Sequence, residues 1–350
     1  MNSSNSILQR RVLADVALLG VAAVWGVTFS VVKEATTELP TFHYLAIRFA
    51  LAALVLAALY PRHFRRLKGG TLKAGVVIGT FLFGGYALQT LGLQTTTPSK
   101  AGFITGLAVV IVPLLSSLFL RERPSRAAVA GVVLATAGLG LLTLGVGSGG
   151  AGAGSAVTGA GAGAAAGADA AMGAAVAGAG ATAGPLIQSG ELLVVGCALS
   201  FTLHIIAVSR FSARHDPVLL AIVQIAVGSV ASAVLAWVFE PPVAVSAIPA
   251  DVWQAIVITG VFATSAAFLV QTTAQRFTTA THTALIFTME PVFAAAYSYV
   301  CLGEPLTLRG VSGGLLVLAG MLAAQVRTAR TTIPGKTHHR EAEEQARRAG

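Results

Sequence analysis

Charge is the first thing that this sequence lacks. Only 11% of its 350 residues are Asp, Glu, Lys or Arg, whereas about a quarter of the residues of a soluble domain are charged. Hydrophobic residues make up 55% of the chain, and its mean hydropathy is +0.78. The composition therefore excludes an ordinary soluble domain and indicates an integral membrane protein.

Cysteine and the motifs of soluble enzymes are also scarce. The two cysteines, Cys197 and Cys301, lie in apolar runs, where we expect free thiols and no disulfide framework. The sequence has no glycine-rich phosphate loop and no cluster of His, Cys and acidic residues with the spacing of metal ligands. We therefore expect no enzymatic activity, no bound metal or cofactor and no direct use of ATP.

What the chain has in abundance is apolar runs long enough to cross a bilayer, which takes about 20 residues. Five runs precede a linker and five follow it, which predicts an all-α integral membrane protein with ten transmembrane helices. Segments 1–12 and 328–350 are polar and are expected to be cytoplasmic tails, the second of them disordered. The expected helices span residues 13–33, 41–60, 72–93, 98–119, 126–146, 190–210, 217–239, 250–273, 280–302 and 307–327.

The linker between the two halves, residues 147–189, is low in complexity. Its first 38 residues, from Gly147 to Gly184, contain 17 Ala, 13 Gly and a single charge, Asp169. Glycine is a poor helix former, and these residues lack the Leu, Ile and Phe that favour membrane insertion. We therefore interpret the segment as an extracytoplasmic tether and not as an eleventh span.

The positive charges are distributed unevenly over this topology. With the N-terminus in the cytoplasm, 19 of the 23 Lys and Arg residues lie on inner segments, three on outer segments and one, Arg48, inside a span. This asymmetry follows the positive-inside rule and predicts cytoplasmic N- and C-termini in a multi-pass protein of the cell (inner) membrane. The net charge of +9 then belongs to the surface of the lipid bilayer and implies no nucleic-acid partner.

The two halves are related by a diverged repeat. A shift of 182 residues gives 14 identities in the 55 positions 86–140, among them Gln89 on Gln271. Each half, 13–146 and 190–327, has five expected helices, and an odd number places the second half in the opposite orientation. The sequence therefore predicts two inverted-topology five-helix repeats, a plan of secondary transporters with the substrate site between the repeats.

One acid is buried in an expected helix of the second half. Glu290 lies near the middle of 280–302 and is followed by Pro291. A carboxyl group that changes charge with access suits both substrate binding and proton coupling. The alternative is a structural acid beside a proline kink. Pro113 is the helix-breaking candidate of the first half, and Ala108 occupies the position of Glu290 there.

Four further polar residues in expected spans are candidates for substrate binding. Arg48 can hold a substrate carboxylate or pair with Glu290, or its side chain can reach the outer head groups. Gln89 and Gln271 are equivalent in the repeats and offer amide groups either to a polar substrate or to neighbouring helices. Gln224 takes the place of Arg48 in the second half.

Three aromatic residues complete the set of binding candidates. Trp25, Tyr86 and Tyr297 lie within expected spans. Trp25 is too deep for an interfacial belt, and Tyr297 shares a helical face with the buried acid. Structural packing is the alternative for these residues. His204 and His282 lie at or near span ends and are interpreted as a satisfied polar residue and an interfacial residue.

Several of these residues together resemble a known family. The marks, in order, are Trp25-Gly26 with Thr28-Phe29, Arg48, the run SKAGFITGLAVVIVPLLSSLFLRERPS and the run MEPVFAAAYSYVCLGEPLT. They resemble the ten-helix EamA-type transporters of the drug/metabolite transporter superfamily over about 13–146 and 190–327. The resemblance implies two EamA-type repeats and secondary transport, often export, of small metabolites, frequently amino acids and related compounds.

The sequence as a whole predicts a secondary active transporter. We expect export of small polar or amphipathic, amino-acid-like metabolites by alternating access, with proton coupling as a hypothesis. The substrate is expected to bind in a central cavity lined by helices 1, 3, 4, 6, 8 and 9 of the ten. The alternatives are an uptake permease of the same fold and a polytopic protein without transport, such as an intramembrane enzyme or an assembly partner. A monomer and a homodimer both remain open.

Overall fold

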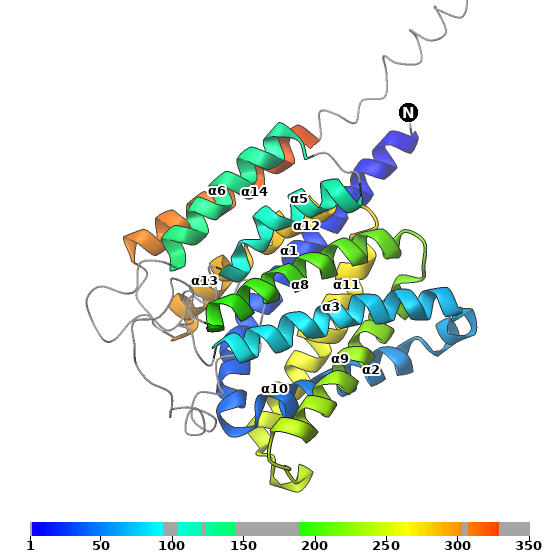
Figure 1. Ribbon diagram of the computed structural model, residues 1–350. Coiled ribbons are helices and arrows are strands. Elements are labelled where there is room, and N and C mark those ends of the chain that lie inside the picture. The colour runs from blue at the N-terminus through cyan, green and yellow to red at the C-terminus, as the bar shows by residue number, and fades with distance from the viewer. Residues whose placement is uncertain (1, 94–103, 121–123, 144–188, 303–306, 329–350) are drawn as a thin grey trace, which may run out of the picture.

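The computed structural model of the chain describes residues 2–93, 104–120, 124–143, 189–302 and 307–328. Every regular element within these residues is a helix, and the helices form one bundle (Figure 1). The elements are α1 (Asn2–Glu38), α2 (Thr41–Leu59), η1 (Pro61–Arg66), α3 (Gly69–Leu93), α5 (Ala108–Phe119), α6 (Arg126–Thr143), α8 (Ser189–Ser212), α9 (Pro217–Phe239), η2 (Val245–Ala247), α10 (Ala250–Ile258), η3 (Thr259–Ala266), α11 (Ala267–Ala274), α12 (Ala280–Phe287), α13 (Glu290–Leu302) and α14 (Leu308–Thr328).

Seven of the described helices are long and apolar enough to cross a membrane. They are parts of α1, α2, α3, α8 and α9, the continuous stretch α10–η3–α11, and the stretch α12–α13. Three shorter apolar helical stretches accompany them, Ile104–Phe119, Arg126–Leu141 and Leu308–Ala324. The described part of the chain is therefore that of a multi-pass membrane protein.

The described helices depart from the expected ones in three places. α1 already begins at Asn2, because no proline or glycine among residues 2–12 stops the helix. The expected helix 250–273 contains a π-helix of eight residues, η3, between α10 and α11. The expected helix 280–302 is interrupted between α12 and α13. Almost all of the linker and of the C-terminal tail lies outside the described residues.

Close packing of α6 on α14 depends on glycine. A Cβ atom at Gly131 would lie 2.6 Å from the carbonyl oxygen of Gly320, and one at Gly320 would lie 2.6 Å from the carbonyl oxygen of Gly131. Gly138 faces the carbonyl oxygen of Gly313 at the same distance. Low residue numbers on one helix meet high numbers on the other, so α6 and α14 are antiparallel neighbours (Figure 1). Small residues allow membrane helices to approach this closely.

α2 and α9 also pack on each other, and an acid–histidine pair joins them at each end. Glu240, after α9, accepts from two backbone N–H groups in the first turn of α2 at 2.8 and 2.9 Å, and its Oε2 lies 2.7 Å from His43 Nδ1. At the opposite end Asp216 accepts from Val218 N at 3.0 Å, and its Oδ2 lies 2.7 Å from His63 Nδ1 in η1. Both pairs join a helix of the first half to one of the second.

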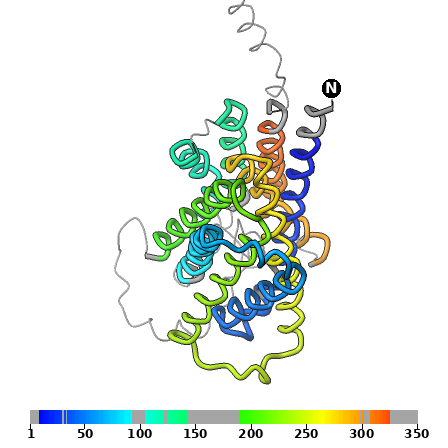
Figure 2. Tube along the Cα trace, turned by 90° about the vertical axis from the view of Figure 1, so that its right-hand side faces the viewer, coloured from blue at the N-terminus to red at the C-terminus, as the bar shows by residue number. Residues whose placement is uncertain are grey.

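The remaining packing also mixes the two halves. α3 packs on α8 and α9, α1 packs on α11, α12 and α13, and α5 packs on α8 and α12. In the view turned by 90°, the blue α1 runs along the yellow and orange segments of the second half (Figure 2). One cluster of buried apolar side chains lies mainly between α2, α3 and α9, and another lies mainly between α6, α12 and α14. A site inside the bundle is therefore built from both halves of the chain.

Candidate functional site

Two helices are interrupted at positions that the repeat makes equivalent. In the first half, the N–H of Leu107 donates to the carbonyl of Ile104 at 3.2 Å, in a tight turn just before α5. In the second half, the N–H of Met289 donates to the carbonyl of Ile286 at 3.0 Å, between α12 and α13. Adding 182 to 104 and 107 gives 286 and 289. Both halves therefore make a tight turn at equivalent positions of the repeat.

The two candidate helix-breaking prolines follow these turns. Pro113 lies inside α5, and Pro291 is the second residue of α13. Because proline has no N–H, it leaves the carbonyl four residues earlier without its helical partner. Those carbonyls belong to Val109 and Phe287, and both residues line a cavity inside the bundle.

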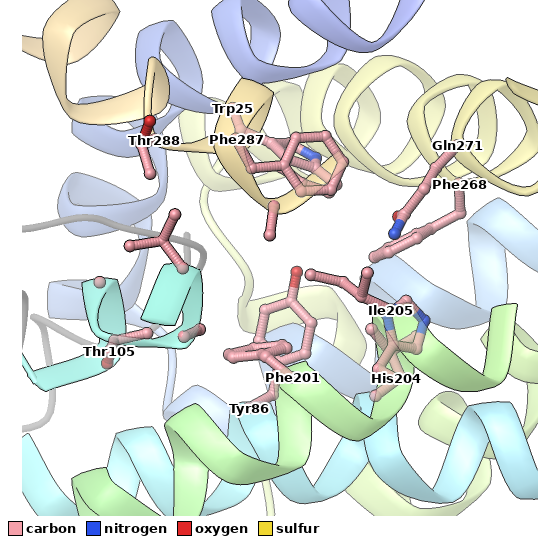
Figure 3. Close-up of a pocket in the computed structure, with 15 residues that line it drawn as sticks. Trp25, Tyr86, Thr105, Phe201, His204, Ile205, Phe268, Gln271, Phe287 and Thr288 are labelled. Atoms are coloured by element: carbon pink, nitrogen blue, oxygen red, sulfur yellow. The ribbon is translucent and has the colours of Figure 1, made fainter. Parts of the chain in front are cut away.

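The empty space of this cavity, counted together with the open space at its mouth, is about 620 Å³, and the cavity lies next to both interruptions (Figure 3). Six stretches of chain line it: α1, α3, residues 105–109, α8, α11, and α12 with Thr288. They correspond to the expected helices 1, 3, 4, 6, 8 and 9. The lining residues are Trp25, Leu82, Tyr86, Thr105, Gly106, Ala108, Val109, Phe201, His204, Ile205, Phe268, Gln271, Ala284, Phe287 and Thr288.

Five of the 15 residues in the wall of the cavity are aromatic. Trp25 stands near Phe268 and Phe287, with ring centroids 5.6 and 5.1 Å away, and Tyr86 meets Phe201 at 5.6 Å (Figure 3). The indole N–H of Trp25 donates to a backbone carbonyl of η3 at 2.8 Å. That hydrogen bond fixes the indole and leaves its apolar surface for the cavity. Such rings suit the apolar or aromatic surface of a ligand and also attract cations to their faces.

Besides two threonines and the hydroxyl group of Tyr86, the polar side chains of the lining include His204 and Gln271. His204 Nε2 lies 2.8 Å from Gln224 Oε1, and Gln224 Nε2 donates to Thr272 Oγ1 at 3.1 Å. The hydroxyl of Thr272 itself donates to a backbone carbonyl at 2.6 Å. The proton of neutral His204 therefore sits on Nε2, and its Nδ1 is a hydrogen-bond acceptor.

Gln271 and its repeat equivalent Gln89 have different surroundings. Both side chains are buried, and neither amide oxygen has a hydrogen-bond partner among the described residues. Gln271 lines the cavity, where its Nε2 donates to Gln275 Oε1 at 3.3 Å, whereas Gln89 lies outside the lining. The oxygen of Gln271 can therefore accept a hydrogen bond from a molecule in the cavity.

Several other predicted binding residues also lie outside the lining. Gln224 reaches the cavity through His204, and Tyr297 is half-buried in α13. Arg48 and Glu290 are only 1% exposed, so both charged side chains are buried within the bundle. Among the eight predicted binding residues, the structure brings three into the cavity wall: Trp25, Tyr86 and Gln271.

Arg48 binds the π-helical segment η3. Its Nε donates to Thr264 Oγ1 at 2.8 Å, and Tyr44, one turn earlier on α2, shares a hydrogen bond of 2.7 Å with Thr259 Oγ1. Ser265 Oγ donates back to the Ala52 carbonyl of α2 at 3.0 Å. π-Helical turns are rare and occur often at functional sites. Here α2 holds the turn in place, and η3 in turn accepts the hydrogen bond of the cavity tryptophan.

Glu290 begins α13 directly after the interruption. A Cβ atom at Gly26 would lie 2.6 Å from the carbonyl oxygen of Glu290, so α1 touches the backbone at the break. Thr288, two residues earlier, lines the cavity. The charges of Arg48 and Glu290 both act on the hydroxyl group of Tyr86, which is itself a lining residue. The two buried charges are therefore within electrostatic reach of the cavity wall.

An all-helical bundle with seven potential membrane spans and an internal cavity defines a multi-pass membrane protein. The chain belongs to the EamA-like transporter family, which matches residues 12–144 and 188–324, and it is therefore a membrane transporter of the drug/metabolite transporter superfamily. It is 31% identical over 323 residues to an uncharacterized transporter of Archaeoglobus fulgidus, covering 91% of this chain and 87% of that protein. It is 24% identical over 314 residues to the uncharacterized transporter YyaM of Bacillus subtilis, covering 88% and 92%. Its fold is similar to a crystal structure with a TM-score of 0.69 at 19% identity, covering 89% of this chain and 98% of that one.

Sequence reasoning missed most of the aromatic wall. Phe268 is the repeat equivalent of Tyr86, since 86 plus 182 is 268, and both line the cavity. The repeat therefore contained the signal for Phe268. Phe201 and Phe287 carried no such signal, because an aromatic residue in an apolar span looks the same whether it packs or lines a cavity. His204 is satisfied by a hydrogen bond, as expected, but it also lines the cavity.

Proposed function

We propose that the protein is a secondary active transporter that exports small amphipathic, amino-acid-like metabolites by alternating access. The observation that carries the proposal is the aromatic cavity between the two halves, with the unpartnered oxygen of Gln271 at its wall. A mostly apolar cavity with a few placed polar groups is the usual form of a small-molecule site. Membership of a transporter family supports transport as the use of this site.

Ten transmembrane helices in two inverted five-helix repeats are part of the proposal. In the repeat, α1 is equivalent to α8, α3 to α11, and α5 to α13. The contact of α1 with α11 therefore corresponds to that of α8 with α3, and the contact of α1 with α13 to that of α8 with α5. All four contacts exist. The same exchange turns the contact of Gly131 with Gly320 into that of Gly313 with Gly138. Antiparallel pairing of equivalent helices is what a two-fold axis in the membrane plane produces.

We also propose that both termini are cytoplasmic, in the cell (inner) membrane. Support comes from the 19 of 23 Lys and Arg residues that this orientation places inside. η1 alone carries three arginines next to the pair of His63 and Asp216. That pair then marks the cytoplasmic end of the α2–α9 contact, and the pair of His43 and Glu240 marks the outer end.

The lining favours a substrate with an apolar or aromatic body and a hydrogen-bond donor. No charged side chain is among the described residues that line the cavity. The oxygen of Gln271 accepts an N–H or O–H donor, and the aromatic faces around Trp25 accept a ring or an ammonium group. Aromatic amino acids and the corresponding amines combine these features.

Coupling to protons is assigned to Glu290 in this proposal. The residue is buried at the start of α13, beside a cavity residue and against the backbone of α1. A buried carboxyl group is stabilised when it binds a proton and becomes neutral. Exposure to one side of the membrane and then to the other would let the group pick up and release that proton during transport.

The test is flux into proteoliposomes that contain the full chain, with labelled L-phenylalanine, L-glutamate and L-lysine as probes. We expect phenylalanine to move well above protein-free liposomes and an imposed pH gradient to accelerate it. Accumulation in the same direction as protons would favour an uptake permease over an exporter. Flux of glutamate alone would overturn the proposed substrate class, and background flux across a broad metabolite panel would overturn transport.

A further inference from the structure

An acid and a histidine meet between α1 and α12, away from the cavity. Asp15 lies in the apolar stretch Gln9–Thr28 of α1, and His282 lies in the first turn of α12. His282 Nδ1 is 3.6 Å from Asp15 Oδ1 and 3.1 Å from the hydroxyl oxygen of Thr278. Neither residue lines the cavity. Interpreting His282 as an interfacial residue from the sequence misses this buried partner.

The pair is largely shielded from solvent. The side chain of His282 is 7% exposed and that of Asp15 is 16% exposed. His282 Nε2 and Asp15 Oδ1 have no hydrogen-bond partner among the described residues. Buried polar atoms are nearly always paired in proteins, so two such atoms in one cluster indicate a role beyond packing.

Arg11 is the other charged group at this pair. It lies one turn before Asp15 on α1, and its charge acts on both Asp15 and His282. α12 also packs on α5, α6, α8 and α14. Within the described residues, these helices place no further charge against the pair. Arg11 favours the charged form of Asp15 and disfavours a charge on the imidazole, whereas the Asp15 carboxylate favours a charge on the imidazole.

The geometry indicates which nitrogen of His282 takes up that proton. Nδ1 faces the hydroxyl oxygen of Thr278 at hydrogen-bond distance and Asp15 Oδ1 at ion-pair distance, so we assign the N–H to Nδ1, with the Thr278 hydroxyl as its acceptor. Nε2 then keeps the lone pair and binds the incoming proton. The imidazolium that forms lies beside the Asp15 carboxylate, which stabilises its charge, and release of the proton restores the neutral ring.

His282 stands at one end of a half-helix, and Glu290 follows the other end. α12 runs from Ala280 to Phe287, and Glu290 comes just after the interruption. α1 contacts both ends, with Asp15 at His282 and Gly26 at Glu290. A change of charge at His282 therefore acts on α12, the half-helix that forms part of the cavity wall.

The first half has no histidine at this position. Lys100 takes the place of His282 under the shift of 182 residues, and it lies outside the described residues. A lysine keeps its charge up to about pH 10, whereas a histidine changes charge near neutral pH. The exchangeable group thus belongs to one half of the repeat.

We propose that Asp15 and His282 form a second proton-binding site, at the cytoplasmic end of α12, which binds one proton and couples it to movement of α12 against α1. This inference rests on the proposed transport function, because coupling requires that α12 moves during a transport cycle. The site is distinct from the cavity and from Glu290, and its ligand is the proton itself.

Proton binding is tested without any substrate. The full chain with ¹⁵N-labelled histidine rings is placed in lipid nanodiscs, and its ring nitrogens are followed by NMR from pH 5 to 8, where histidines change charge. We expect the His282 signal, assigned by its loss in His282→Gln, to titrate with a midpoint that moves in Asp15→Asn. Asp216→Asn, the matched change in the pair with His63, should leave it unchanged. A His282 signal that stays constant, or that titrates identically in Asp15→Asn, overturns the proposal.

Coupling is tested in proteoliposomes that contain a pH-sensitive dye, with labelled L-phenylalanine as the probe. His282→Gln, His282→Lys and Asp15→Asn should lower the protons moved per phenylalanine by about half, because one of the two proposed proton sites is lost, with phenylalanine exchange at equal pH retained. His63→Gln should change neither quantity. Unchanged proton movement in the three variants would overturn the second site and leave transport standing. Absence of phenylalanine flux in the unaltered protein would count against the proposed function, and the NMR titration would still decide whether the pair binds a proton.

Discussion

The interrupted helices of the two halves share a backbone turn but differ in their side chains. Leu107 and Met289 make equivalent turns, and residues beside both turns line the cavity. Ala108 follows the first turn, whereas Glu290 follows the second. The turns that the halves share therefore belong to the scaffold, and the candidates for proton coupling lie at positions where the halves differ.

The largest effect is expected from breaking the shared scaffold. Gly138→Val places a side chain 2.6 Å from the carbonyl oxygen of Gly313, where backbone and not a flexible side chain must move. We expect loss of the folded protein, because α6 and α14 can no longer approach. Size-exclusion chromatography in detergent measures the folded fraction. Gly20→Ala on α1, with nothing within 4 Å, is the control and should remain folded.

The second-largest effect is expected at Glu290, the buried acid that only the second half has. Glu290→Gln keeps the shape of the side chain and removes its exchangeable proton. We expect pH-driven flux of phenylalanine in proteoliposomes to fall by about tenfold or more, while exchange at equal pH persists. Equal pH-driven flux in Glu290→Gln and in the unaltered protein would remove Glu290 from the coupling mechanism.

The third effect compares Arg48 with Gln224, its counterpart in the second half. Thr264→Val removes the acceptor of the Arg48 Nε hydrogen bond, and Thr272→Val removes the acceptor of the Gln224 amide. Hydrogen bonds to charged groups contribute about 1.5–3 kcal/mol and neutral ones about 0.5–1.5 kcal/mol. Thr264→Val should therefore lower the free energy of unfolding more than Thr272→Val does.

Thermal unfolding of the two threonine variants measures this difference, and serine at either position is the matched control. Thr264→Ser and Thr272→Ser keep the hydroxyl group and should behave like the unaltered protein. A larger loss for Thr272→Val would mean that the buried cation at Arg48 is held by other groups, and that η3 does not depend on it.

The smallest effect separates the two equivalent glutamines. Gln271 lines the cavity and Gln89 does not, so Gln271→Leu should raise the KM for phenylalanine by about fivefold, the size of one neutral hydrogen bond. Gln89→Leu, the matched change in the first half, should leave KM unaltered. Similar changes in both variants would indicate that the amides act through helix packing and not through the substrate.

Much of the scaffold could be predicted from the sequence, because apolar length and the repeat are long-range signals. The cavity residues Trp25, Tyr86 and Gln271 are among the predicted binding residues, because polar and aromatic residues are conspicuous in an apolar segment. The π-helix of η3 could not be predicted, because its wide turns depend on partners from α2 such as Arg48 and Tyr44. The pairing of Asp15 with His282 could not be predicted either, because the two residues lie more than 260 positions apart in the sequence.

We propose that one cavity, built from equivalent segments of the two halves, opens in turn to each side of the membrane. Gly106 and Thr288 are repeat equivalents, and both line the cavity. In a chain with Cys197 and Cys301 replaced by alanine, Thr288→Cys and Gly106→Cys should each react with a membrane-impermeant methanethiosulfonate reagent applied from either side of the liposome. Reaction of both cysteines from one side only, or from neither side, would contradict the account.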